Sequence, residues 1–288
     1  ERAVDWEGFI ADMFAEVRHL CTAYGKIDLL WFDGDWEATA EEWRTPELVQ
    51  MIESLQPGIV FNNRLRHANL GHYDTPETTY PVFQKSAPWE FCGTLGDNWD
   101  GIAANENVIS TDELHRLFCD MISNGGNLLM NVSPDGAGVI PDVQQKPMNE
   151  LGRWVKEHAE AVYGTEGGLP FGLFNGASTR RKSVLYLFCY DIPQGEIVVK
   201  GIGSNIRKIT HLVSGQELKH RFSRGRANFG AKGWLWIDLP KECVEPLATV
   251  IKIEFEHDVA EILCPDGKKL KWVGRPSFDE QSLYETRD

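Results

Sequence analysis

In residues 1–165, stretches whose apolar side chains recur at helical spacing alternate with short apolar runs. This alternation limits the possible folds more than any other feature. Apolar side chains recur at helical spacing in residues 9–20, 45–55 and 110–122, and again after Pro141. The short, mostly apolar runs are residues 27–32, 59–63 and 127–132. Strands of that kind are typical of a parallel sheet buried on both faces, so the pattern predicts an α/β domain.

The pattern changes after Gly164. Short β-rich runs separated by turn residues follow at residues 183–190, 196–202, 206–213, 233–240 and 248–255. Such spacing predicts an antiparallel β-sandwich. The charge changes at the same place, because residues 1–165 carry 11 basic and 27 acidic side chains, whereas residues 166–288 carry 18 and 16. We therefore predict two domains, residues 1–165 and residues 166–288.

Composition excludes several classes of partner. The net charge of −14 over 288 residues disfavours nucleic acid. No apolar run is long enough to span a bilayer, so no membrane association is expected. The six cysteines form no CxxC pair, which argues against a zinc site and favours buried free thiols in a reducing compartment. We expect a cytoplasmic protein on this basis.

Polar side chains follow the predicted strands of the first domain. Asp33 follows the run 27–32, Arg64 follows the run 59–63, and Glu77 lies in the polar stretch beyond it. The carboxyl ends of parallel strands meet at the functional edge of a sheet or barrel. Carboxylates beside exposed tryptophans suit a sugar site, and we expect four such tryptophans, Trp31, Trp36, Trp89 and Trp99. From spacing alone, a turn or helix cap is the commoner role for an aspartate like Asp33.

Several motifs in order resemble glycoside hydrolase family 29, the retaining α-L-fucosidases. They are LLWFDGDW, FNNR, YDTPE, WEFCGTLGDNW, SNGGNLLMNVSPDGAGVI and LGRWVKEHAEAVYGT, which together span roughly residues 5–165. The resemblance implies a (β/α) TIM-like barrel followed by a β-sandwich, and hydrolysis of terminal α-L-fucosyl linkages on a fucosylated glycan. It implies no metal and no organic cofactor.

Roles for individual residues also come from this resemblance. Asp33 would be the nucleophile and Glu77 the general acid/base. Trp31 would form a pocket wall beside Asp33, and Arg64 would contact the sugar and the surroundings of the nucleophile. Trp99 would line the fucose pocket. Two neighbouring carboxylates are expected to have structural roles instead. Asp35 is expected to cap a turn after Gly34, and Glu90 is expected to be a buried hydrogen-bond anchor.

The sequence departs from the family in one large respect. A complete barrel needs about eight strand–helix units, and residues 1–165 supply only about half of them. We expect the C-terminal half of a barrel belonging to a longer enzyme, completed by an N-terminal segment, a second copy or another chain. The rival hypothesis is a catalytically silent fragment that serves as a carbohydrate-binding or assembly module. The linkage preference is open, because variable loops build the aglycone side.

Overall fold

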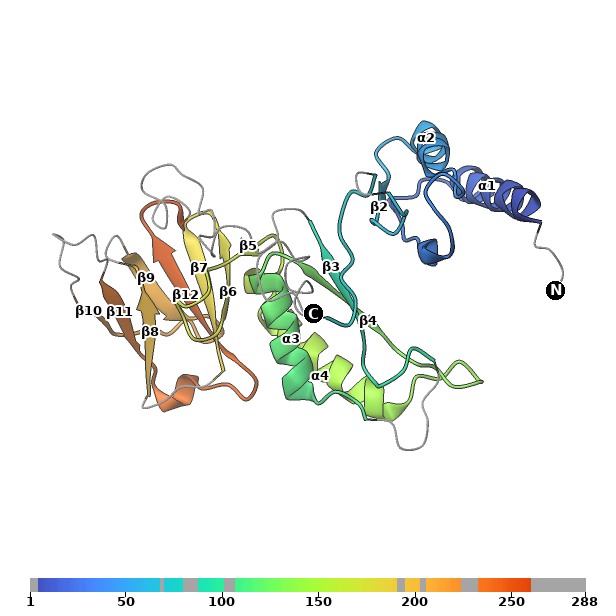
Figure 1. Ribbon diagram of the computed structural model, residues 1–288. Helices are drawn as coiled ribbons and strands as arrows, with labels where there is room; N and C mark the ends of the chain where they lie inside the picture. Colours follow the sequence, from blue (N-terminus) through green and yellow to red (C-terminus); the bar gives the residue numbers. More distant parts are fainter. Residues whose placement is uncertain are drawn as a thin grey trace, which may run out of the picture. The chain divides into compact units, whose positions relative to one another are not determined.

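The structure is a computed structural model that describes residues 5–67, 70–79, 88–100, 107–190, 195–202, 206–223 and 233–259 (Figure 1). The chain divides into two compact units. The first contains residues 1–95 and 126–132, and the second contains residues 96–125 and 133–288. This division differs from the predicted boundary at residue 165, because helices near the end of the predicted first domain belong to the second unit. The boundary at residue 165 stays a prediction.

The described residues of the first unit form two helices and four short strands. The helices are α1 (Trp6–Ala23) and α2 (Thr45–Leu55), and the strands are β1 (Leu29–Leu30), β2 (Val60–Phe61), β3 (Glu90–Thr94) and β4 (Asn127–Asn131), with a 3-10 turn at Asp35–Glu37. Helix α1 begins where the Asp5 carboxylate accepts a hydrogen bond from the Gly8 amide, and Gly25, at φ 83°, lies just beyond its end. Both helices were predicted from their apolar spacing, and both are confirmed.

All strand contacts in this unit are parallel and follow the order of the sequence. Strand β1 pairs with β2, and β3 pairs with β4. Single parallel bridges join Asn62 to Tyr73, Asp74 to Trp89 and Glu77 to Cys92. Residues 73–77 thus lie between β2 and β3. Successive parallel strands are the arrangement expected within a (β/α) barrel; the partial barrel itself stays a proposal.

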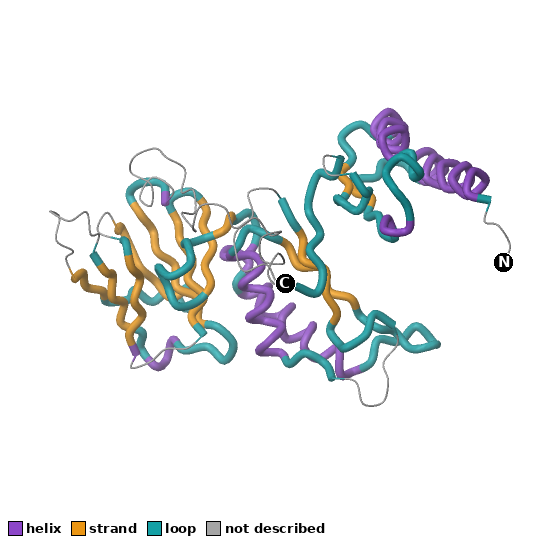
Figure 2. The backbone as a smooth tube through the Cα atoms, viewed as in Figure 1, coloured by secondary structure: helices purple, strands orange, loops and turns teal. Residues whose placement is uncertain are grey.

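These strands are shorter than predicted (Figure 2), and several of their side chains are more exposed. The run 27–32 yields a strand of only two residues, and Leu29 in it is 47% exposed. In β4, Leu129 is 40% exposed. The prediction of strands covered on both faces is therefore wrong for β1, β2 and β4, whereas successive residues of β3 are buried. Among the described residues β1 pairs with β2 alone, so its other edge lacks the hydrogen bonds that extend a strand.

Trp89 is a second correction, because it was expected to be exposed and is only 1% exposed. Its indole packs directly on Gly126 at the start of β4, where a Cβ atom would overlap the ring. Glycine at this position therefore allows the close approach of β3 and β4.

We predict that Gly126→Ala lowers the free energy of unfolding by about 2–3 kcal/mol, because the added methyl forces the buried indole out of its position. Urea denaturation followed by tryptophan fluorescence measures this. Gly136→Ala is the matched control, since a Cβ there meets no atom within 4 Å. Equal urea midpoints for the two variants would contradict the packing role of Gly126.

Three helices and an antiparallel β-sandwich form the second unit. The helices are α3 (Thr111–Ser123), α4 (Asp142–Glu157) and α5 (Ala159–Val162). The strands are β5 (Glu166–Gly167), β6 (Ala177–Arg181), β7 (Val184–Cys189), β8 (Glu196–Lys200), β9 (Ile206–His211), β10 (His220–Ser223), β11 (Trp234–Asp238) and β12 (Thr249–Phe255), with a 3-10 turn at Lys241–Cys243. Helix α3 begins with the predicted capping box of Ser110 and Glu113 and lies beside β5 and β6 (Figure 1).

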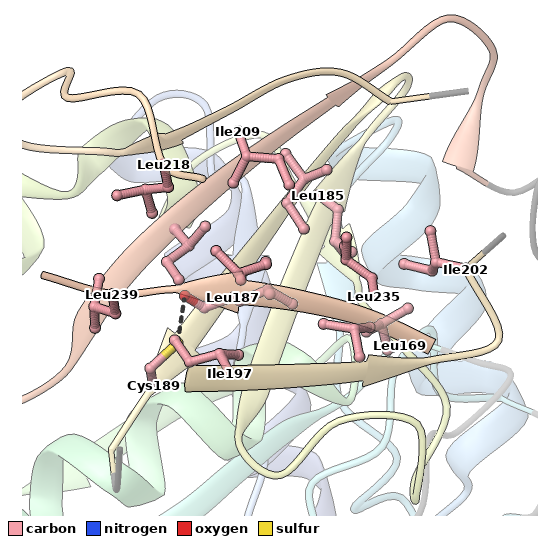
Figure 3. Close-up of a cluster of buried hydrophobic side chains, with 14 of the residues drawn as sticks. Leu169, Leu185, Leu187, Cys189, Ile197, Ile202, Ile209, Leu218, Leu235 and Leu239 are labelled. Carbon is pink, nitrogen blue, oxygen red and sulfur yellow. Dashed lines mark hydrogen bonds between the residues drawn. The ribbon is translucent and has the colours of Figure 1, made fainter. Parts of the chain in front are cut away.

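Two antiparallel sheets pack face to face in this unit, ordered β5-β6-β7-β12-β9 and β10-β11-β8. Their inner faces share one apolar core, in which Leu187 of the first sheet and Leu235 and Ile197 of the second are buried (Figure 3). The predicted sandwich is confirmed. Five cysteines, Cys21, Cys92, Cys119, Cys189 and Cys243, are buried free thiols, as predicted, and Cys264 lies outside the described residues. Within the described chain, no helix combines the length and apolarity needed to cross a bilayer.

His115 of α3 is a buried titratable group of this unit, 1% exposed. Its ring lies edge-on to Trp154 of α4, with ring centroids 4.3 Å apart, and its Nε2 is 3.8 Å from the Sγ of Cys119. Burial, reinforced by the neighbouring His158 and Arg116, lowers the pKa of His115 to about 4.

This lowered pKa predicts acid sensitivity. An unfolded histidine titrates near pH 6.5, so the stability that His115 provides as a neutral ring is complete above that pH. It is lost as pH falls from about 6.5 toward 4, at a cost of about 3 kcal/mol. His115→Gln should remove this part of the pH dependence in urea denaturation at pH 7, 5.5 and 4.5, whereas His220→Gln, at an exposed position of β10, should leave it unchanged. Parallel pH dependence in wild type and His115→Gln would rule the effect out.

Candidate active site

Asp33 lies in the first unit, just after β1, where the chain leaves the strand and turns at Gly34. Gly34 has φ 83°, a left-handed conformation that favours glycine. This turn leaves the Asp33 side chain 52% exposed, so its carboxylate is accessible. Asp35, two residues on, accepts a hydrogen bond from the Arg66 amide at 2.7 Å. Asp35 thus fixes the loop after β2. It was expected to cap a turn after Gly34, but no side-chain cap hydrogen bond forms at that turn, and the carboxylate instead bonds a distant segment.

Asn62 holds the segment that carries Asp33. Its side-chain amide accepts a hydrogen bond from the Phe32 N–H at 2.9 Å and donates one to the Phe32 carbonyl at 2.8 Å. Asn62 is completely buried, so these two bonds satisfy its own amide group as well as the part-buried backbone groups of Phe32. The side chain replaces the strand pairing that β1 would need to continue, and it fixes the backbone immediately before Asp33.

We expect Asn62→Ala to lower the free energy of unfolding by about 2 kcal/mol, because the N–H and C=O of Phe32 lose their partners. Urea denaturation measures the loss. Asn63→Ala is the matched comparison from the same motif: the Asn63 side chain is exposed and contacts Asp74 and Thr75, so a smaller loss is expected. If Asn63→Ala lowers the free energy of unfolding as much as Asn62→Ala does, the burial of Asn62 does not explain the loss of stability.

Arg64 brings the two predicted catalytic carboxylates together. Its Nη1 donates to Asp33 Oδ1 at 2.8 Å, and its Nη2 forms an ion pair with Glu77 Oε2. The guanidinium is itself held in place, because its Nε donates to Thr75 Oγ1 at 3.0 Å. Partial burial opposes a rise in the pKa of Arg64, but the hydrogen bonds to Asp33 and Glu77 outweigh it, and the pKa is raised. One cation thus lies between two carboxylates.

Glu77 is positioned by the backbone of its own segment. Glu77 forms a parallel bridge with Cys92 in β3. The Cys92 amide donates a hydrogen bond to the Pro76 carbonyl, and the Thr78 amide donates one to the Cys92 carbonyl. The Glu77 side chain is 36% exposed, whereas that of Arg64 is 13% exposed. The carboxylate is therefore anchored at its backbone and open on one side to a ligand.

Trp31 stacks on Arg64, with the guanidinium carbon 4.4 Å from the ring centroid. Trp31, Asp33, Arg64 and Glu77, which the sequence placed in one site, therefore meet in the first unit. Trp99, the fifth predicted site residue, belongs to the second unit and is 42% exposed. Its place in the pocket stays a prediction.

Glu90 lies close to this group at the first residue of β3, and it is half-buried there, whereas a buried hydrogen-bond anchor was expected. Burial raises the pKa of the Glu90 carboxyl, and the nearby Trp31 indole opposes the rise without forming a hydrogen bond of ordinary geometry. Burial and the negative charge of Glu90 raise the pKa of Tyr73 to about 12, although the positive charge of Arg64 opposes the rise. Sequence reasoning gave no role to Tyr73 and Thr75, although both lie in the YDTPE motif: Thr75 accepts a hydrogen bond from Arg64, and the charge of Arg64 acts on Tyr73.

The described residues include no group of three or more histidine, cysteine, aspartate or glutamate side chains placed to hold a metal ion. What the site does offer is a pair of carboxylates joined by a guanidinium, with an aromatic face beside them. Such a set can form a covalent bond to an electrophilic carbon, hold or release a proton, and stack on the apolar face of a sugar.

Comparison with known proteins gives a consistent result. A family model described as alpha-L-fucosidase matches residues 2–160. An alpha-L-fucosidase of Dictyostelium discoideum is 26% identical over 216 residues, 69% of this chain and 46% of the relative. The human tissue alpha-L-fucosidase is 26% identical over 168 residues, 54% of this chain and 35% of the relative.

Solved structures agree with these relatives. Alpha-L-fucosidase isoenzyme 1 from Paenibacillus thiaminolyticus has a TM-score of 0.79 and 28% identity, covering 89% of this chain and 64% of its own. The alpha-L-fucosidase of Vibrio sp. strain EJY3 has a TM-score of 0.75 and 25% identity, covering 89% of this chain and 47% of its own. The chain spans between about a third and a half of the curated relatives that it matches. Because the family model covers more than half of its residues, the chain belongs to the alpha-L-fucosidase family.

Proposed function

We propose that this chain carries the catalytic carboxylates of a retaining exo-α-L-fucosidase that hydrolyses terminal α-L-fucosyl linkages of fucosylated glycans. One observation carries the proposal: Arg64 binds Asp33 and Glu77 through different nitrogens of one guanidinium. Two carboxylates on one guanidinium lie close together, and a retaining glycosidase needs its carboxyl groups only about 5–5.5 Å apart.

In the proposed reaction, Asp33 Oδ attacks the anomeric carbon of an α-L-fucoside and the bond to the leaving oxygen breaks. Glu77 delivers its proton to that oxygen as the aglycone departs. The resulting β-linked fucosyl-enzyme is then attacked by water, whose proton Glu77 takes back. Two inversions at the anomeric carbon give α-L-fucose.

Arg64 and Trp31 have supporting roles in this scheme. Arg64 holds the Asp33 carboxylate in position to face the sugar, because its Nη1 donates a charge-assisted hydrogen bond to Asp33 Oδ1. Glu77 must move off Arg64 to meet the leaving oxygen, and its exposed side leaves room for that movement. Trp31 offers an indole face to the C–H side of the fucose ring, and Trp99 is proposed as a further wall.

The proposed pocket requires further barrel units, supplied by an N-terminal segment, another chain or a second copy. The test is hydrolysis of 4-nitrophenyl α-L-fucoside, with the anomer of the released fucose followed by proton NMR before it mutarotates. α-L-Fucose as first product supports the retaining mechanism, and β-L-fucose refutes it. The second candidate function is a catalytically silent carbohydrate-binding or assembly module. No turnover by the folded chain, even joined to the N-terminal part of a related fucosidase, would support that candidate.

A further inference from the structure

Two tryptophans lie on the outer face of the three-stranded sheet β10-β11-β8. Along β11, Leu235 and Ile237 are completely buried in the sandwich core, so the alternating Trp234 and Trp236 project from the opposite face. Trp234 is 45% exposed. We call this surface the tryptophan face, defined by Glu196, Val198, Lys200, Arg221, Ser223, Trp234, Trp236 and Asp238.

Cations on the neighbouring strands hold both indoles. Trp236 is in register with Arg221 of β10, whose guanidinium carbon lies 4.4 Å from the ring centroid. Trp234 is in register with Lys200 of β8, whose Nζ lies 5.7 Å from its ring centroid. Arg221 is fixed in turn by Glu196 at 2.7 Å, and the Trp236 Nε1–H donates to Ser223 Oγ at 3.2 Å. The rings are therefore positioned before any ligand arrives, which lowers the entropic cost of binding.

The surroundings of the two rings indicate the chemistry of the ligand. Lys200 and Arg221 balance Glu196 and Asp238, so this face attracts neither a polyanion nor a polycation. The apolar surface consists of two indoles and Val198 within a border of charged and hydroxyl groups. That area is small for a stable protein interface, which needs about 1,000 Å² or more. A sugar ring, by contrast, has an apolar C–H face and a rim of hydroxyls that matches this border.

We propose that the tryptophan face binds pyranose rings of a neutral glycan, separately from the carboxylate pair. Trp234, the more open indole, stacks on the sugar. Trp236, covered on one side by Arg221, supports Trp234 and presents the edge of its ring. Side chains of the border donate and accept hydrogen bonds with the hydroxyls. The inference does not depend on fucosidase activity, because the ligand needs no fucose.

The test is titration of the full chain with lacto-N-neotetraose, a neutral tetrasaccharide without fucose, followed by NMR of the tryptophan indole N–H signals. We expect shifts of the Trp234 and Trp236 signals. Trp234→Ala should weaken binding about tenfold, the loss expected for roughly 60 Å² of apolar contact, and Trp234→Phe should lose less. Tyr163→Ala removes an exposed aromatic of the same unit that is not part of this face, and should leave the dissociation constant unchanged.

Three results would overturn the proposal. The first is binding that survives Trp234→Ala unchanged, and the second is no indole shift at millimolar tetrasaccharide with the chain folded. The third is self-association in sedimentation that Trp234→Ala abolishes, which would make the face an interface between copies. Failure of the fucosidase proposal leaves this titration unaffected, since none of these variants touches Asp33 or Glu77.

Discussion

Replacing Asp33 with alanine is expected to lower kcat/KM for 4-nitrophenyl α-L-fucoside by about 10⁴-fold or more. Removal of a covalent nucleophile leaves only binding and general polarisation to act on the substrate. The exposed carboxylate of Asp33, held at 2.8 Å by Arg64, is the group available for that attack. The measurement is initial-rate kinetics on the chain in the form that shows turnover, with circular dichroism to verify folding.

Asp35→Ala is the matched control, because it removes a carboxylate two residues away that bonds the Arg66 amide. Less than about a tenfold loss is expected from it, as for a loop-positioning residue. Azide, added as an external nucleophile, provides a second test. With Asp33→Gly, azide should attack the α-fucoside directly and give β-L-fucosyl azide. Residual activity of Asp33→Ala above a tenth of wild type would remove Asp33 from the nucleophile's role.

Much of the fold follows from local sequence signals. Helix α3 was predicted because Ser110 and Glu113 satisfy the first amides of the helix, and the same side chains cap it in the structure. The sandwich strands β7, β8, β9, β11 and β12 were predicted because they are short β-rich runs separated by turn residues. In the structure, apolar side chains of both sheets meet in one core. Strand β6 was missed, since Ala177, Ser178 and Thr179 are small or polar residues, yet they are buried.

Contacts distant in sequence were less predictable. The extent of β1 depends on pairing partners along both edges, which the residues of β1 do not encode. Trp89 was wrongly expected to be exposed, because nothing near it in sequence reveals that Gly126 packs against its ring. Motif resemblance did bring Asp33, Arg64 and Glu77 into one site. It gave no sign that Asn62 holds the Phe32 backbone or that Thr75 holds the Arg64 guanidinium, since those hydrogen bonds join segments 30 and 11 residues apart.

Glu77→Ala is expected to act differently from Asp33→Ala, because a general acid matters most when the leaving group is poor. Hydrolysis of an unactivated fucosyl glycan such as 2′-fucosyllactose should fall by about 10³-fold, within the usual contribution of general acid–base catalysis. For an aryl fucoside whose leaving phenol is already acidic, the first step needs little protonation, and the fucosyl-enzyme should accumulate as a burst of released phenol. The comparison of the two substrates measures this contrast.

Azide also separates the two carboxylates by stereochemistry. In Glu77→Ala, Asp33 is intact and forms the β-linked fucosyl-enzyme, which azide then opens to give α-L-fucosyl azide, the opposite anomer from that expected with Asp33→Gly. Asp74→Ala is the matched control, since Asp74 is the other carboxylate of the same segment and accepts a hydrogen bond from Asn63 at 3.2 Å. If the α-azide came from Asp74→Ala and not from Glu77→Ala, the acid/base role would pass to Asp74. Arg64 would then hold Glu77 as a structural ion pair, with Asp33 still the attacking group.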